Sequence, residues 1–476
     1  MDKAFTNIDN YRKWLDSQSG SLSSTAKVIT DRAAKIDKDI HAFISIDSEI
    51  ITARAELLEK QSPKGSLWGV PVAVKDNICI KDALTTCASK ILDGFKPPYN
   101  ATVIEKLQAE GALLMGRANM DEFAFGSSCE TSCYGPTKNP RDTSRIPGGS
   151  SGGSVAAVAS RQVVAAIGSD TGGSIRQPAS LCGVVGFKPT YGRVSRYGLI
   201  AFASSLDQIG PITTSVADCA RMLEVISGHD AKDSTCVDID VPRYTDSLNK
   251  GIKGVTIGIP KEYFSEGIDE DVRRNILEAI DVIKKLGAKV IDVTLPHTKY
   301  AVSCYYIIAP AEASSNLARY DGVHYGRRSE EKKDLINMYI ASRNEGFGDE
   351  AKRRILLGTY SLSSGYYDAY YLKAQKVRTR IADDFREVFK KCDCILTPTS
   401  PTTAFKIGER TDDPLKMYLS DIFTIPANLA GIPAVSIPCG EDREGLPIGL
   451  QLMAGPLSEE KLIRVGDAYE RARDSR

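Results

Sequence analysis

Apolar side chains recur along this chain at two spacings, one typical of helices and the other of short buried strands. The first 60 residues carry apolar positions at helical intervals among Lys, Asp, Ala and Glu, as residues 28–36 illustrate. This pattern predicts two or three helices that pack on the outside of the fold. Residues 69–75 then form an almost uninterrupted apolar run ending at Lys75, which predicts a buried strand.

The rest of the chain continues this alternation. Apolar runs predict strands over residues 112–116, 163–167, 254–260, 289–295, 394–398, 433–438 and 446–453. Helical periodicity predicts helices over residues 101–110, 154–160, 269–286, 426–430 and 459–473, and a mostly helical region over 301–391. Strands that alternate with helices indicate an α/β fold layered around a largely parallel or mixed sheet. We therefore predict an N-terminal helical segment over residues 1–60, packed on one large domain over residues 61–476.

Composition narrows the classes of function. Lys plus Arg and Asp plus Glu both number 61, whereas a protein whose main task was to grip nucleic acid would carry a basic surplus. The close cysteine pairs, Cys129/Cys133 and Cys392/Cys394, lack the Cys-x-x-Cys spacing of zinc or redox sites, so we expect reduced, mostly buried thiols and no metal. The sequence starts without a signal-peptide pattern and contains no run of about 18 apolar residues. These features predict a soluble, cytoplasmic protein without membrane contact.

Two glycine-rich turns, over residues 148–154 and 172–174, each precede a segment that is predicted to be helical. Glycine lets a backbone approach a ligand closely, and a helix N-terminus presents unpaired N–H groups, so both turns suit an anion. A phosphate is a weak candidate because neither turn continues as the Gly-Lys-Ser/Thr of a nucleotide-binding loop. Each turn instead presents a serine, Ser150 or Ser174, which indicates acyl transfer with an oxyanion.

A serine nucleophile needs a base. The four histidines lie away from these turns, which gives a Ser-His-Asp triad little support. Lys75 is the other candidate because a lysine at the end of a buried strand loses solvation, which favours the neutral amine that a base requires. Taken alone, Lys75 could also have a purely structural role, with its aliphatic stem buried and its ammonium group in a salt bridge.

The combined pattern resembles the amidase signature family. The segments that carry the resemblance are Val74-Lys-Asp-Asn77, Gly148-Gly-Ser-Ser-Gly-Gly-Ser154 and Gly168-Ser-Asp-Thr-Gly-Gly-Ser-Ile-Arg-Gln-Pro178. The resemblance implies a large mixed β-sheet covered by helices on both faces, with residues 61–476 as the amidase signature domain. It also implies a Ser–cis-Ser–Lys triad with Ser174 as nucleophile, Ser150 as bridging serine at a cis peptide and Lys75 as general base.

The implied chemistry is a proton relay. Neutral Lys75 accepts a proton from Ser150, which accepts one from Ser174, so that Ser174 attacks an amide carbonyl. The N–H groups of the following turn hold the oxyanion; its predicted members are Thr171, Gly172 and Gly173, together with Ser174 itself. The relay then protonates the departing amine, and water releases the acyl group. Asp170 and Arg176 also match the signature, and we interpret them as residues that orient the turn.

Within the family, the chain is most similar to the glutamine-hydrolysing subunits of bacterial tRNA-dependent amidotransferases. The stretches that agree are residues 117–128, 135–140, 309–322, 353–360, 365–371 and 421–431. This resemblance implies that Arg354 binds the α-carboxylate of glutamine and Asp421 its α-ammonium, with Tyr305 nearby. Tyr306 is an equal candidate to Tyr305 by spacing.

The same resemblance implies partners. It predicts a heterotrimer with two other amidotransferase subunits: one binds ATP, Mg²⁺ and aminoacyl-tRNA, either Glu-tRNA(Gln) or Asp-tRNA(Asn), and the other is small. No cofactor is then expected in this chain, in agreement with its lack of a nucleotide-binding loop. The tyrosines at 366, 367, 370 and 371 precede a basic run over 373–380 that could touch RNA, but their helical spacing favours packing.

Two alternatives remain. A stand-alone amidase acting on simple or peptide amides would share Lys75, Ser150 and Ser174, but it would not need both Arg354 and Asp421. A non-catalytic scaffold or RNA-binding subunit would keep only the fold. The intact triad residues and the zero net charge count against that second alternative.

Overall fold

The computed structural model describes residues 2–61, 65–264, 267–331 and 334–475. Across these residues the strands form one mixed sheet of 11 strands in the order β1-β3-β2-β4-β6-β5-β10-β11-β9-β7-β8. The strands are β1 Phe43–Ser45, β2 Pro71–Lys75, β3 Leu113–Ala118, β4 Ala165–Asp170, β5 Val185–Lys188, β6 Gln208–Thr213, β7 Thr256–Pro260, β8 Lys289–Val293, β9 Cys394–Pro398, β10 Ala434–Glu441 and β11 Pro447–Ala454. The predicted α/β class with a large mixed sheet is confirmed.

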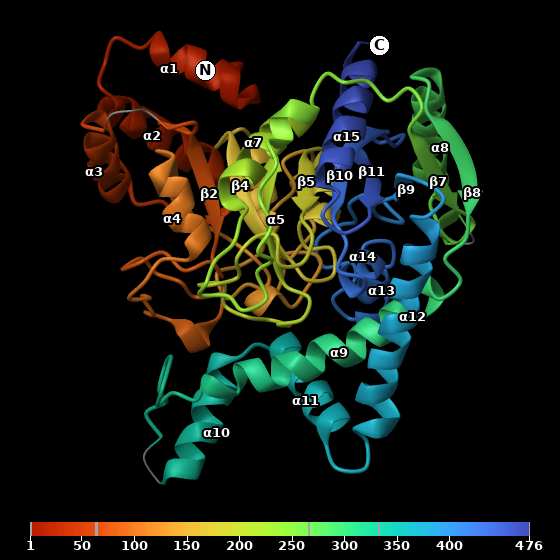
Figure 1. The fold of residues 1–476 in the computed structure, drawn as a ribbon. Helices are drawn as coiled ribbons and strands as arrows, with labels where there is room; N and C mark the ends of the chain where they lie inside the picture. Colours follow the sequence, from red (N-terminus) through yellow and green to blue (C-terminus); the bar gives the residue numbers. More distant parts are fainter. Residues whose placement is uncertain (1, 62–64, 265–266, 332–333, 476) are drawn as a thin grey trace.

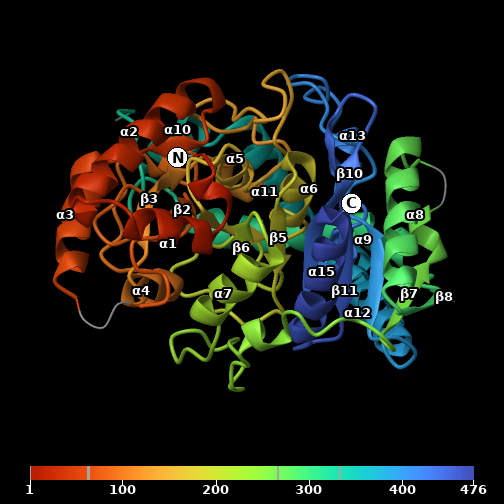
Figure 2. The same cartoon turned by 90° about the horizontal axis from the view of Figure 1, so that it is seen from above.

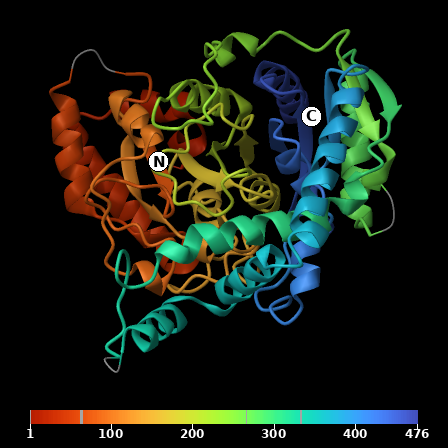
Figure 3. The same cartoon turned by 60° about the horizontal axis from the view of Figure 1, so that its bottom comes forward.

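Helices cover both faces of this sheet. Figure 2 shows α5 and α6 on one side of the central strands and α7 and α15 on the other. Helices α9 to α12 form a further group, which lies below the sheet in Figure 1 and crosses in front of it in Figure 3. The helices are α1 Ile8–Asp16, α2 Leu22–Ile40, α3 Ser48–Glu59, α4 Thr102–Ala109, α5 Gly152–Ala159, α6 Arg176–Cys182, α7 Val216–Ile226, α8 Glu270–Lys285, α9 Ala301–Asn316, α10 Leu335–Gly346, α11 Asp349–Leu362, α12 Lys373–Val388, α13 Pro414–Leu419, α14 Ile425–Leu429 and α15 Glu459–Asp474.

Local sequence explains where many of these elements begin and end. Helix α8 starts after Asp269, whose side chain accepts a hydrogen bond from the Asp271 N–H, and carries acidic residues in its first turn and lysines in its last. Gly287, with φ +89°, follows its C-cap, where a residue with a side chain would be strained. Apolar residues at helical spacing face the core, as the sequence pattern predicts.

The first 60 residues contain the three helices α1, α2 and α3 and also one short strand. Strand β1 pairs antiparallel with β3 at one edge of the sheet, where Phe43 lies opposite Ala118. The sequence pattern did not predict this strand, because three residues at an edge give almost no periodic signal. The Tyr11 hydroxyl donates to the Gly69 carbonyl at 2.9 Å, which joins α1 to the residues before β2.

The sheet topology brings the predicted site residues together. Strand β2 lies between β3 and β4 and is parallel to both. Parallel strands end at the same edge of a sheet, so Lys75 at the end of β2 and Asp170 at the end of β4 lie near each other. The second glycine-rich turn leaves β4 directly, and the first leads into α5. The topology therefore brings Lys75 and both turns to one edge.

Candidate active site

Lys75 lies at the centre of this edge and is fully buried. Its Nζ donates to Ser150 Oγ at 2.7 Å, to Ser151 Oγ at 3.0 Å and to Ser169 Oγ at 3.0 Å. Burial lowers the pKa of Lys75 to about 8, although the carboxylate of Asp121 acts in the opposite direction. A substantial fraction of neutral amine is therefore present near neutral pH, directly beside Ser150.

Ser150 follows a cis peptide bond, Gly149–Ser150. Asp121 packs against this segment: its N–H donates to the Ser150 carbonyl at 3.3 Å, and its buried carboxylate accepts from the Cys129 N–H at 2.9 Å. A Cβ at position 149 would collide with the Asp121 carboxylate and lie 2.7 Å from the Ser128 nitrogen. Only glycine fits there, so the backbone just before Ser150 packs directly against Asp121.

Ser174 lies in the second turn with 8% of its surface exposed. Its carbonyl accepts from the Ser151 N–H at 3.0 Å, which holds the two turns together. Among the described residues the Ser174 hydroxyl makes no hydrogen bond, so the structure forms the Lys75–Ser150 part of the relay but not the Ser150–Ser174 part. Catalytic hydrogen bonds often tighten only when substrate is bound.

The turn that contains Ser174 provides N–H donors. Within the described chain the N–H groups of Thr171, Gly172 and Ser174 make no hydrogen bond, although all of these residues are buried. The N–H of Gly173, in contrast, donates to Asp170 Oδ1 at 3.0 Å. The N–H of Gly173 therefore already has an acceptor, unlike the other three predicted oxyanion-hole donors. Its φ of +138° shows that it is required for the shape of the turn instead.

Asp170 and Arg176 orient this turn, as the sequence predicts. They form a fully buried pair in which both Arg176 Nε and Nη2 reach the Asp170 carboxylate at 2.9 Å. Burial alone would raise the pKa of Asp170, but the charge and hydrogen bonds of Arg176 lower it to about 2. Arg176 also donates to Gln451 Oε1 and Asn428 Oδ1, each at 2.6 Å. Because every group of the pair has partners, its ionised form is stable without water.

Tyr305 and Asp421 flank the same turn. A Cβ added at Gly172 would lie 2.8 Å from Tyr305 Cζ, and one added at Gly173 would lie 3.3 Å from Asp421 Oδ1. The Asp421 carboxylate accepts a hydrogen bond from the Ser127 hydroxyl through Oδ2, while its buried Oδ1 has no partner among the described residues. Burial raises the pKa of Asp421 to about 7. An unpaired, buried carboxylate oxygen beside the turn that contains Ser174 is suited to a cationic group of a substrate.

Arg354 lies on α11 with only 3% of its surface exposed. Its Nε donates to Glu350 Oε1 at 2.7 Å, and its guanidinium carbon lies 4.6 Å and 4.7 Å from the ring centroids of Tyr306 and Tyr418. These two rings stack on each other with centroids 3.9 Å apart. The structure therefore separates the two candidate tyrosines: Tyr305 lies at the turn that contains Ser174, whereas Tyr306 stacks against Arg354.

Several residues of the site were not identified from sequence. Ser151 and Ser169 share Lys75 with Ser150, and their positions inside the two signature segments were the available signal. Ser127, which holds Asp421, lies in one of the family-like stretches but carries no chemical motif of its own. Glu350 and Tyr418 hold Arg354 and give no sequence signal that separates them from surface residues.

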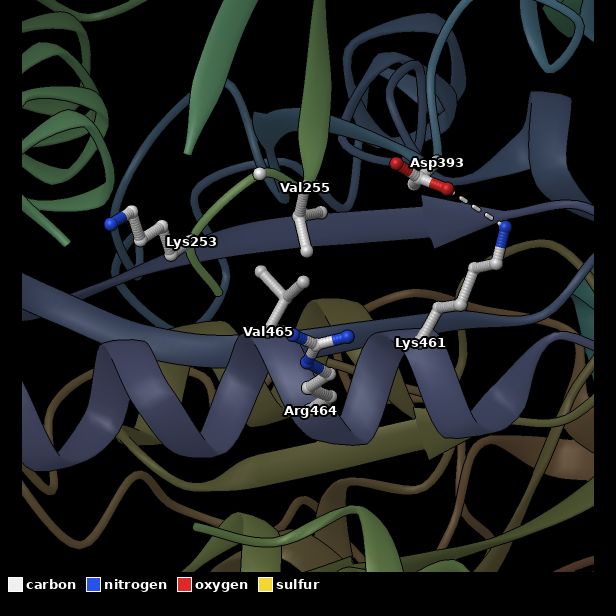
Figure 4. Close-up of a pocket in the computed structure, with 7 residues that line it drawn as sticks. Lys253, Val255, Asp393, Lys461, Arg464 and Val465 are labelled. Carbon is white, nitrogen blue, oxygen red and sulfur yellow. Dashed lines mark hydrogen bonds and ion pairs between the residues drawn. The ribbon is translucent and has the colours of Figure 1, made fainter. Parts of the chain in front are cut away.

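Away from Lys75, a hollow of about 260 Å³ lies between the residues just before β7 and α15. Figure 4 shows its charged residues, with Lys253 on one side, the Lys461–Asp393 pair on the other and Arg464 between them. Lys461 Nζ reaches Asp393 Oδ1 at 3.0 Å, and Arg464 Nε donates to the Gly251 carbonyl at 2.6 Å. Two of its three cations are thus engaged within the protein, and no serine lines the hollow.

Other sequence-based expectations can be compared with the described residues. Among the cysteines there, all but Cys133 and Cys439 are buried, which confirms that the thiols are mostly buried. Tyr366, Tyr367 and Tyr370 pack on neighbouring tyrosines but remain 42%, 44% and 40% exposed, so the expected packing is only partial. In the part of the chain that the structure describes, no cluster of three or more His, Cys, Asp or Glu could hold a metal, and no helix could cross a membrane.

Comparison with known proteins agrees with this geometry. The family model described as Amidase matches residues 25–463. A curated relative, the A subunit of the glutamyl-tRNA(Gln) amidotransferase of Syntrophus aciditrophicus (strain SB), is 60% identical over 457 residues, which cover 95% of this chain and 94% of the relative.

Solved structures agree as well. The crystal structure of the corresponding glutamyl-tRNA(Gln) amidotransferase A subunit from Thermotoga maritima is 46% identical, with a TM-score of 0.79 over 95% of this chain and 94% of that one. The peptide amidase of Stenotrophomonas maltophilia is 29% identical, with a TM-score of 0.83 over 98% and 97% of the two chains. The residues matched by the family model include Lys75, both glycine-rich turns, Arg354 and Asp421, and the relatives cover nearly the whole sequence. The chain belongs to the amidase family.

Proposed function

We propose that this protein hydrolyses glutamine to glutamate and ammonia as the glutaminase subunit of a tRNA-dependent amidotransferase. The observation that carries the proposal is the hydrogen bond of 2.7 Å from buried Lys75 to Ser150, beside a turn with unpaired N–H groups. Two of the relatives named above are A subunits of glutamyl-tRNA(Gln) amidotransferases, and they support the choice of reaction.

The first half-reaction forms an acyl-enzyme. Neutral Lys75 accepts the Ser150 proton as Ser150 accepts the Ser174 proton, and Ser174 Oγ attacks the side-chain amide carbon of glutamine. The negative charge on the former carbonyl oxygen is held by the N–H groups of Thr171, Gly172 and Ser174, which are already in place before reaction. The proton gained by Lys75 passes back through Ser150 to the departing nitrogen, and ammonia leaves.

The second half-reaction uses the same groups in reverse. A water molecule gives its proton to the relay and attacks the γ-glutamyl ester on Ser174. The tetrahedral intermediate again places its oxyanion on the turn, and its collapse returns a proton to Ser174. Glutamate is released, and neutral Lys75 and the Ser174 hydroxyl are restored for the next cycle.

Glutamine differs from a simple amide by its α-ammonium and α-carboxylate. We propose that the unpaired Asp421 Oδ1 binds the ammonium and that Arg354 binds the carboxylate. Among the described residues, Arg354 makes a hydrogen bond only through Nε, so its remaining N–H groups can donate to the carboxylate. Tyr305 limits the space above Gly172, next to the reacting carbon.

The ammonia would be used by a partner. We propose that one partner subunit binds ATP, Mg²⁺ and Glu-tRNA(Gln), or Asp-tRNA(Asn), and that a second, small one completes a cytoplasmic heterotrimer. The amide nitrogen of glutamine would then replace an activated carboxyl oxygen of the tRNA-bound amino acid in the larger partner. This chain supplies the ammonia and holds no nucleotide-binding loop of its own.

The experiment that tests this proposal starts from tagged protein purified with whatever subunits accompany it. Ammonia release from glutamine is measured with and without ATP and Glu-tRNA, beside a Ser174→Ala variant prepared in the same way. Release that depends on Ser174 and rises with ATP and Glu-tRNA supports the proposal. Release from simple amides, indifference to Glu-tRNA and the absence of partners would favour a stand-alone amidase, the activity named for the 29% identical relative.

A further inference from the structure

The short segment over residues 121–127 follows β3 and touches each part of the site. At its start, Asp121 holds the backbone of Ser150. At its end, the Ser127 hydroxyl donates to Asp421, and the Ser127 carbonyl accepts from Gln177 Nε2 at 3.0 Å. One short segment therefore connects the bridging serine, the helix that follows the nucleophile and the proposed ammonium-binding carboxylate.

Glu122 lies in this segment and is not used by the chemistry described above. It is only 3% exposed, and its carboxylate accepts from the Ser89 hydroxyl. It also accepts from the Gly348 N–H, at 2.9 Å through Oε2 and 3.1 Å through Oε1. Burial disfavours the charged form and raises the pKa of Glu122 to about 7, and the hydrogen bonds from Ser89 and Gly348 partly offset this cost.

The group that Glu122 fixes is the start of α11. Gly348 is the N-cap of this helix and provides no side-chain cap, so the Glu122 carboxylate supplies the negative charge that a helix N-terminus favours. A Cβ at position 348 would lie 2.5 Å from Glu122 Oε2, so a side chain there would displace the Glu122 carboxylate from the Gly348 N–H. Arg354 follows six residues later on the same helix, about 9 Å along its axis.

We propose that Glu122 is a positioning residue for glutamine binding. By anchoring the N-terminus of α11, it sets the position of Arg354, while Ser127 of the same segment sets the position of Asp421. The spacing between the two charges that select free glutamine is thus fixed by one segment. The role in substrate binding rests on the proposed function, whereas the anchoring of α11 can be tested without it.

Two substitutions test the proposal from opposite sides of the contact. Glu122→Gln removes the carboxylate charge and leaves one oxygen to accept from both the Ser89 hydroxyl and the Gly348 N–H. Gly348→Ala leaves Glu122 intact but forces its carboxylate and the start of α11 apart. Each is expected to raise the KM for glutamine about tenfold, the effect of losing a charge-assisted hydrogen bond, with kcat changed less than about twofold. The double variant is expected to be no worse than either single variant, because both break one contact.

The matched control is Glu459→Gln. Glu459 is a buried glutamate, 1% exposed, that also accepts a distant backbone N–H, from Thr190 at 2.8 Å, away from α11. This variant is expected to leave the KM for glutamine unchanged. Additive effects of Glu122→Gln and Gly348→Ala, an equal fall in kcat, or an equal effect of Glu459→Gln would overturn the proposal.

Hydrogen exchange of the amides in residues 346–353 separates this inference from the proposed function. Glu122→Gln is expected to speed exchange there but not in α15. Unchanged exchange would overturn the anchoring role whatever the substrate. If the wild-type complex released no ammonia from glutamine, the proposed function would fail, and faster exchange in the variant would still support the anchoring of α11.

Discussion

The most informative perturbation is a change of pH that titrates Lys75 while Ser174 is probed with a reagent that carries no charge. Burial lowers the pKa of Lys75 to about 8. About one tenth of the protein then has neutral Lys75 at pH 7, and about nine tenths has it at pH 9. Since only the neutral amine starts the relay, the reactivity of Ser174 is expected to rise about tenfold over this interval and then level off.

The assay is the second-order rate of inactivation by an uncharged sulfonyl fluoride between pH 6 and pH 10. Such a reagent avoids the titration of the substrate and of Asp421, whose own pKa is about 7. A lysine with the ordinary pKa of about 10.4 would give a rise of about a hundredfold from pH 7 to pH 9 with no plateau. That profile, or a rate independent of pH, would refute the assignment of a desolvated Lys75 as base.

A matched variant sharpens the same experiment. Lys75→Ala is expected to react slowly near neutral pH and to recover only in proportion to hydroxide, which replaces the missing base. Ser154→Ala is the control. Ser154 ends the first glycine-rich turn and lies in α5, but its hydroxyl donates to the Ile167 carbonyl and makes no hydrogen bond with Lys75. Its profile is expected to match that of the unaltered protein.

Stability, substrate selectivity and the nucleophile can each be tested separately. Between pH 8 and pH 10.5 the unfolded chain binds a proton at Lys75 that the folded chain does not. The free energy of unfolding in urea, relative to that of the Lys75→Met variant, is therefore expected to increase by about 3 kcal/mol as the pH rises through this window. A decrease would contradict the burial of the Lys75 charge. Asp421→Asn and Arg354→Gln are each expected to raise the KM for glutamine by a factor on the order of a hundred, because each removes a buried charged contact. The rate of propionamide hydrolysis is expected to stay unchanged. Equal losses of activity on both substrates would count against a glutamine-specific pocket. Ser174→Ala is expected to abolish hydrolysis with an unchanged thermal midpoint, and activity that survives the change would remove Ser174 as nucleophile.

Much of the fold could be predicted because its strands and helices have clear periodicity. Strand β9 has the predicted bounds, Cys394–Pro398, since it is an apolar run buried on both faces. Strands β5 and β6 were not predicted: β5 has four residues, and β6 contains Gly210 and Pro211, which usually mark turns. Helix α7 was also not predicted, although Ser215 as its N-cap and its apolar spacing provided a usable signal.

The residues of the candidate site likewise fall into those that a local motif marks and those that it does not. Lys75, Ser150 and Ser174 could be selected because local motifs place a base candidate and two serines next to glycine turns. The roles of Gly173, Ser127 and Glu350 could not, because each depends on a contact that no local motif encodes. Gly173 illustrates the point, since its N–H is engaged by Asp170, and no sequence pattern shows which N–H groups of a turn remain free.

The central claim, that Ser174 becomes acylated by glutamine through the Lys75–Ser150 relay, is tested most directly by trapping the intermediate. The purified complex is mixed with isotope-labelled glutamine, quenched in acid within the first turnover and digested for mass spectrometry, beside Ser150→Ala and Lys75→Ala. The account predicts a labelled γ-glutamyl ester on the peptide that contains Ser174 and a strongly reduced yield in both variants. Ammonia release without any label on Ser174, or full labelling in the absence of Lys75, would contradict it.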